Sequence, residues 1–94
     1  MLQFKFHNIQ YKQNKLEDCL TMQGEVTNES SKDYNCVAFR VLLYVKTVSI
    51  SSFVFTIKGF LKSQTKDLEV RIPELSYAVA KEITAQEIFA ESAY

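Results

Sequence analysis

Residues 24–46, GEVTNESSKDYNCVAFRVLLYVK, decide the fold, because two strand-like runs flank six residues with strong turn propensity. Before the turn, alternate positions carry Leu20, Met22, Gly24 and Val26; after it, they carry Val37, Phe39, Val41, Leu43 and Val45. A period of two is typical of a strand with one buried face. The intervening residues 28–33 favour a turn, because their side chains hydrogen-bond to their own backbone. We therefore predict two core strands joined by a short turn.

The second face of the strand over residues 36–46 is unusual because half of it is apolar. Ala38, Leu42 and Tyr44 occupy positions that a half-buried strand normally fills with polar residues. Two interpretations stay open. A neighbouring loop or the last segment of the chain covers this face, or the face contacts a partner protein or a second copy, since sizeable exposed apolar patches usually have a use.

Further strands are predicted on both sides of this segment. Alternation indicates a strand over residues 2–6 that extends through Ile9 and Tyr11, one over residues 50–60, and one over residues 68–72. The last of these ends at Pro73 or lies at a sheet edge, because proline cannot donate to a central ladder. Five strands at short spacing predict a β-sandwich or a barrel.

The tail, residues 76–94, fits two kinds of structure. Its Ala, Lys, Glu and Gln residues favour a helix by intrinsic propensity, yet apolar residues can also line one side of an irregular strand: Val79, Ile83, Ala85 and Phe89. We favour a strand, because the edges of a five-stranded sandwich still need cover. A helical tail stays open as the alternative.

Composition indicates one ordered domain over residues 1–94. Apolar residues make up 47% and charged residues 23% of the 94, which is typical of a globular chain. Eleven basic residues balance eleven acidic ones, so phosphate-directed nucleic-acid binding is disfavoured and self-association meets little charge repulsion. No run of about 18 apolar residues predicts a membrane span, and the N-terminal residues do not resemble a signal peptide.

The cysteines and the histidine do not form a recognisable site. If the two runs pair about the turn, Cys19 and Cys36 lie roughly 20 Å apart, whereas a disulfide needs Cα atoms within about 7 Å. Crossing to a second sheet at the turn would leave a similar offset. Two unpaired thiols indicate a reducing compartment. His7 is interpreted as a half-exposed strand residue, because no nucleophile or orienting group can be assigned to it.

Several motifs in this order resemble the FxLYD domain family. They are GEVTN (residues 24–28), the Ser-rich turn with Asp33-Tyr34 after it, and VLLY (residues 41–44), in which Leu43-Tyr44 matches the family's Leu-Tyr pair. Val41 and Val45 replace the Phe and Asp of the family's name-giving motif. LEVRIP (residues 68–73) is similar to the family's penultimate strand, and the resemblance covers residues 18 to 90.

The resemblance implies a single immunoglobulin-like antiparallel β-sandwich of about six or seven strands, in a prokaryotic envelope or secreted protein without catalysis. Localisation stays open, since the unpaired thiols and the absence of a signal peptide indicate the cytoplasm. The motif residues suit this fold. Gly24 lets a backbone or large side chain pack close, and Asn28 tolerates left-handed geometry and can cap the turn. Tyr34 and Tyr44 bury large areas while keeping a polar tip.

We expect a non-catalytic module for protein binding or structural support. Its contact with a protein partner or a second copy would use the outer face of the strand over residues 37–46 or an exposed strand edge, with Leu42 and Tyr44 as the main residues and Arg40 as their polar neighbour. We assign no enzyme activity, cofactor or metal. The alternative is a small-ligand-binding or enzyme accessory subunit with a site in the end loops or between the sheets.

Overall fold

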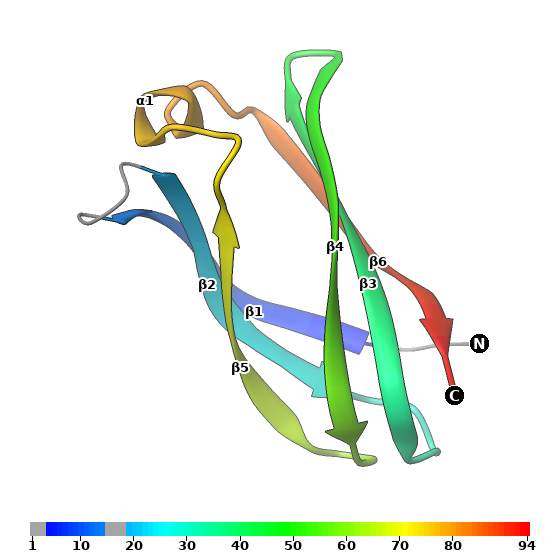
Figure 1. Cartoon of the computed structure of the whole chain (residues 1–94). Helices are drawn as coiled ribbons and strands as arrows, with labels where there is room; N and C mark the ends of the chain where they lie inside the picture. The colour runs from blue at the N-terminus through cyan, green and yellow to red at the C-terminus, as the bar shows by residue number, and fades with distance from the viewer. Residues whose placement is uncertain (1–3, 15–18) are drawn as a thin grey trace.

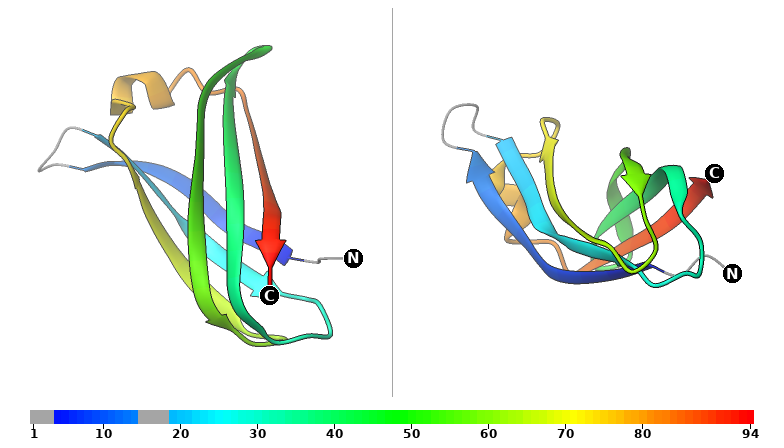
Figure 2. Two further views of the ribbon diagram at one scale, coloured as in Figure 1. Left: turned by 45° about the vertical axis from the view of Figure 1, so that its right-hand side comes forward. Right: turned by 90° about the horizontal axis from the view of Figure 1, so that it is seen from below.

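The computed structural model describes residues 4–14 and 19–94, and these form two three-stranded sheets packed face to face (Figures 1 and 2). The elements in chain order are β1 (Phe4–Asn14), β2 (Cys19–Asn28), β3 (Tyr34–Val45), β4 (Val48–Phe60), β5 (Thr65–Ile72), α1 (Tyr77–Ala80) and β6 (Ala85–Ala93). The sheets have the orders β1-β2-β5 and β4-β3-β6, and every strand pair is antiparallel. The predicted all-β antiparallel sandwich is confirmed.

Most predicted strands are present but longer than expected. The first runs on to Asn14, while residues 2 and 3 lie outside the described part of the chain. The third and fourth predicted strands begin earlier, at Tyr34 and Val48, and the fifth ends at Ile72 directly before Pro73. Antiparallel pairing extends each strand as far as its neighbour supplies hydrogen bonds, which alternation in one segment cannot show.

The tail combines both predicted structures. One helical turn, α1, is followed by strand β6, which pairs with β3. The strand prediction is therefore confirmed for residues 85–93. The predicted inward face of this strand is wrong, because Ile88 and Ala90 pack against the core whereas Phe89 points outward and is 45% exposed. Val79 and Ile83 do pack against the core.

The chain crosses between the sheets three times. The Ser-rich turn after β2 leads into β3 of the opposite sheet, so the two runs that flank this turn do not pair with each other. A second crossing, over residues 61–64, leads from β4 to β5 at the same end of the sandwich. The third crossing passes through α1 at the other end (Figures 1 and 2).

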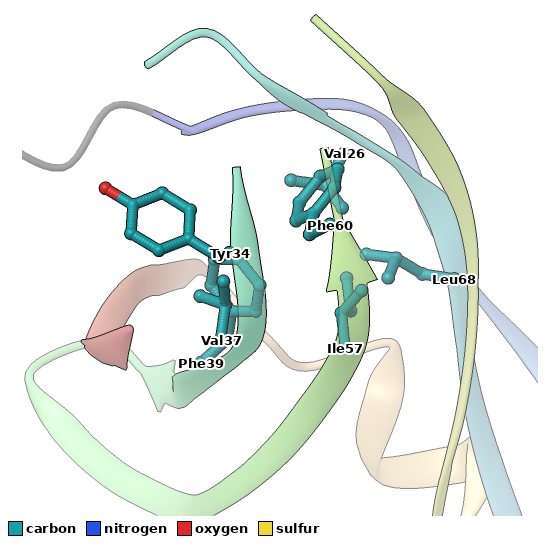
Figure 3. Close-up of a cluster of buried hydrophobic side chains, with 7 residues drawn as sticks. All are labelled: Val26, Tyr34, Val37, Phe39, Ile57, Phe60 and Leu68. Carbon is teal, nitrogen blue, oxygen red and sulfur yellow. The ribbon is translucent and has the colours of Figure 1, made fainter. Parts of the chain in front are cut away.

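The core lies between the inward faces of the two sheets. On β3 the side chains of Val37, Phe39, Val41 and Leu43 are fully buried, as alternation predicted. Phe39 is the centre of an aromatic group: its ring meets those of Phe4 and Phe6 edge-on and stacks on that of Phe55, with centroids 5.1 to 5.3 Å apart. Figure 3 shows Phe39 within one of the two core clusters.

Strand β1 contains a bulge that explains why residue 24 is a glycine. Asn8 and Ile9 together lie opposite Gly24, because the register shifts between His7 and Gln10. Asn8 has a left-handed backbone, with φ 53°, and the extra residue returns Ile9 to the core face. A Cβ on residue 24 would lie 3.0 Å from the His7 oxygen and 3.2 Å from the Ile9 Cα. The predicted close approach at Gly24 is confirmed.

Asn28 joins the two crossings at one end of the sandwich. Its side chain is fully buried, and its Nδ2 donates to the Lys32 and Phe60 carbonyls at 3.0 and 3.3 Å. Its Oδ1 accepts from the backbone N–H and hydroxyl of Ser30. The Asn28 backbone also bonds to Gln64 and Ser63 of the second crossing. The predicted cap is confirmed, whereas the left-handed residues of the described chain include Asn8 and Ser63 but not Asn28.

The two cysteines lie in opposite sheets at opposite ends. Cys19 is buried and pairs with Asn14 in register, while Cys36 is half-buried and lies opposite Lys58. No disulfide joins them, as the predicted offset required.

Candidate functional site

The three predicted interface residues share one surface. Arg40, Leu42 and Tyr44 are alternate residues of β3, which is the central strand of its sheet, and all three are half-buried on its outer face. Their neighbours Val37 to Leu43 on the inward face are fully buried. The structure therefore brings the three residues together on the side of the sheet that faces away from the core.

Two residues that sequence reasoning did not assign to this surface enlarge it. Val54 of β4 and Phe89 of β6 lie directly opposite Arg40 on its two sides, and they are 42% and 45% exposed. Both are diagonal neighbours of Leu42, within reach of large side chains. We call this surface of Arg40, Leu42, Tyr44, Val54 and Phe89 the β3 patch.

Arg40 connects the three strands that carry the β3 patch through side-chain hydrogen bonds. Its Nη2 and Nε donate to Glu91 Oε1 at 3.0 and 3.1 Å, and its Nη1 donates to Ser52 Oγ at 2.9 Å. Glu91 belongs to β6 and Ser52 to β4. The guanidinium is thus held in one orientation among apolar side chains, which reduces the entropy that a contact with a partner would cost.

The last segment of the chain does not cover this face. β6 pairs beside β3, in the plane of the sheet, so the earlier interpretation of the tail as a cover for Leu42 and Tyr44 is wrong. The register explains how β6 instead adds Phe89 to the surface. A signal for Phe89 is present in the sequence, since Ile88 and Ala90 flank it at the alternate core positions.

The outer face of the other sheet is polar. His7 is half-buried there, with Nε2 3.0 Å from Thr27 Oγ1, and Thr27 is in turn 2.7 Å from Thr65 Oγ1. The three residues belong to β1, β2 and β5 and form a hydrogen-bonded row across the sheet. This confirms the interpretation of His7 as a half-exposed strand residue.

Two hollows of the described surface lie along one side of the sandwich, between the edges of the two sheets. One groove of about 380 Å³ and another of about 260 Å³ lie between β1 and the segment that contains β6. Tyr11 crosses this side, and its hydroxyl donates to Gln86 Oε1. Burial raises the pKa of Tyr11 to about 12, because the phenolate would lose hydration there.

Two further features of the described residues bear on function. Residues 4–14 and 19–94 contain no group of three or more His, Cys, Asp or Glu side chains arranged to hold a metal ion. In the same part of the chain, no helix has the length and apolar character needed to cross a membrane.

Comparison with known proteins gave no match to a protein-family model, to a curated protein or to a solved structure.

Proposed function

We propose that this β-sandwich is a non-catalytic protein-binding or structural module that contacts its partner through the β3 patch. The observation that carries the proposal is the side-by-side position of Val54, Leu42 and Phe89 on three paired strands, around an arginine held by two of those strands. Aromatic residues and arginine are the side chains most often found at the energetic centres of protein interfaces. A rigid sheet presents them with little ordering cost.

The order of the strands supports an immunoglobulin-like sandwich as the class of this module. If β1, β2, β3 and β5 are taken as strands A, B, C and E, and β4 and β6 as C′ and F, both sheets have orders that occur in immunoglobulin-like folds. The resemblance of residues 18 to 90 to the FxLYD family supports the same class. We extend the proposal on this basis to a prokaryotic protein that acts in the cell envelope.

The test replaces apolar side chains of the β3 patch by polar ones. A photo-crosslinking residue placed at position 54 of the chain, expressed in its native host, should yield a protein adduct. Leu42→Asp combined with Tyr44→Ser should abolish this adduct while far-ultraviolet circular dichroism stays unchanged, because both side chains lie outside the core. Ser31→Asp, in an exposed turn at one end, is the matched control and should leave the adduct intact.

Two results would count against the proposal. If Leu42→Asp with Tyr44→Ser unfolds the chain, these side chains belong to the core and do not form an interface. If a thermal-shift screen against metals, nucleotides and sugars gives stabilisation of about 2.7 kcal/mol at a hundred times the dissociation constant, the alternative of a small-ligand-binding subunit is favoured instead.

A further inference from the structure

One side of the sandwich is lined by two strand edges that pair on only one side. β1 pairs with β2 and β6 pairs with β3, and within the described residues neither pairs with another strand. We call the space between these edges the β1/β6 seam. Its two grooves, of about 380 and 260 Å³, are lined by apolar side chains that include Phe6, Ile9, Ile83 and Ile88.

The two edges run in opposite directions at matching levels. β2 ends and β3 begins at the Asn28 end, so β1 runs away from that end and β6 runs toward it, as the arrows in Figure 1 show. The bond between Tyr11 and Gln86 fixes their relative height. Because the strands are antiparallel, residues 9–12 of β1 and residues 85–88 of β6 therefore occupy the same level of the seam, with Gln10 at the level of Glu87 and Lys12 at the level of Ala85.

The charges of the two edge strands are opposite. β1, FKFHNIQYKQN, contains two lysines and no acidic residue, whereas β6, AQEIFAESA, contains two glutamates and no basic residue. At the common level, exposed Lys12 and exposed Glu87 lie on the outer faces of their sheets. A strand that joined the β6 edge there would be favoured if it carried a basic outer face, which β1 has.

We infer that the partner at the β1/β6 seam is a second copy of this chain, related by a two-fold axis parallel to the strands. In this dimer, residues 9–12 of each copy pair with residues 85–88 of the other in antiparallel directions, which places Lys12 and Glu87 at diagonal positions on the outer face. Each β1-β2-β5 sheet continues into the β6-β3-β4 sheet of the partner copy. Two six-stranded sheets result, with the apolar lining of both seams enclosed between them.

Alternative contacts between copies are less favourable. A two-fold axis perpendicular to the sheets would pair β1 with β1 and β6 with β6, which places lysine near lysine and glutamate near glutamate. The opposite side of the sandwich, between β4 and β5, lacks such complementarity, because β5 carries two basic and two acidic residues.

Two charge reversals test the pairing. Sedimentation equilibrium from micromolar to millimolar concentration should give the mass of two chains for the unmodified protein. Lys12→Glu and Glu87→Lys, each measured alone, should weaken dimerisation about tenfold, because each creates two like-charge contacts per dimer. An equimolar mixture of the two variants should form a heterodimer as tight as the original, since both contacts then join opposite charges. Both side chains are exposed, so circular dichroism should show that each variant folds.

The matched controls reverse charges at the other side of the sandwich. Lys58→Glu on β4 and Glu69→Lys on β5 are equally exposed and should leave the dimer unchanged. A monomer at every concentration would overturn the inference, as would species larger than two chains. So would a dimer that tolerates both reversals, or a mixture of Lys12→Glu and Glu87→Lys that fails to restore association. Arg40, Leu42, Tyr44 and Val54 of the β3 patch lie on β3 and β4, away from the seam, so loss of this dimer would leave the proposed function standing.

Discussion

Ile9 lies directly over Gly24, at the point where β1 contains one residue more than β2. The bulge moves the apolar side chains of β1 from even to odd positions, so that Phe4, Phe6, Ile9 and Tyr11 all pack toward the core. The absence of a side chain at residue 24 is what allows the strand to bend there without separating from β2.

Gly24→Ala should lower the free energy of unfolding by about 1 to 3 kcal/mol, because its Cβ would overlap the Ile9 side chain and press on the His7 and Ile9 backbone. Urea denaturation measures the change. In an Ile9→Ala background the same substitution should cost less, since only the backbone contacts remain. Equal costs in both backgrounds would show that Ile9 is not the residue that requires the glycine.

Asn28→Ala should cost about 2 to 4 kcal/mol of stability in the same assay. The Lys32 and Phe60 carbonyls and the Ser30 donors all lose a partner where Asn28 itself is fully buried. Ser30→Ala, which removes only the hydroxyl, should cost about 1 kcal/mol and serves as the comparison. Near-equal effects would mean that Asn28 caps the turn but does not link the two crossings.

Tyr11 should make stability depend on pH in the alkaline range. Its pKa is about 12 in the folded chain and 10 when exposed, so the folded state holds the proton more tightly. This contribution is complete below pH 10 and is lost as the pH rises toward about 12. Tyr11→Phe should therefore lose less stability than the original protein between these values. Urea denaturation at several pH values measures the free energy of unfolding of both proteins. If it falls equally with pH in the two, the assignment to Tyr11 is contradicted.

Phe39 and Phe89 should respond differently to truncation, although they lie on paired strands. Phe39→Ala should cost about 3 to 5 kcal/mol, because it empties the centre of the aromatic group. Phe89→Ala should cost less than about 1 kcal/mol, because the side chain is 45% exposed on the outer face. Thermal unfolding of both variants compares them. A reversed order would mean that the inner and outer faces of this sheet are assigned the wrong way round.

The inward residues of the strands could be predicted from sequence because burial on one face imposes a period of two. The prediction was correct on β3 from Val37 to Leu43, which alternate without interruption, but not at Val45, which is only half-buried beyond the register shift after Leu43. It failed on β6, because Ala85 and Phe89 were assigned to the inward face, whereas the regular alternation before the extra residue at Glu91 places Ile88 and Ala90 there. The sequence contains a sign of the β1 bulge at Asn8, because the apolar residues Phe6 and Ile9 are three positions apart and not two. A single irregular interval of this kind can equally mark the end of a strand.

The candidate site could be predicted only along a single strand. Arg40, Leu42 and Tyr44 are neighbours in the sequence pattern, whereas Val54 and Phe89 reach them through pairing with segments far along the chain. The bond from Arg40 to Glu91 joins residues 51 positions apart. Strand register is set by the whole sandwich, so contacts of this kind require the folded structure.

The position of Asn28 also determines where the molecule opens first. Two of the three crossings meet at its buried side chain, whereas the third, at the far end, is longer and contains one helical turn, whose Ser76 makes no side-chain capping bond. Amide exchange in native conditions should therefore be slowest near Asn28 and should quicken along each strand toward α1. Thermal fluctuations would spread the layers apart from the α1 end while their other ends stay joined.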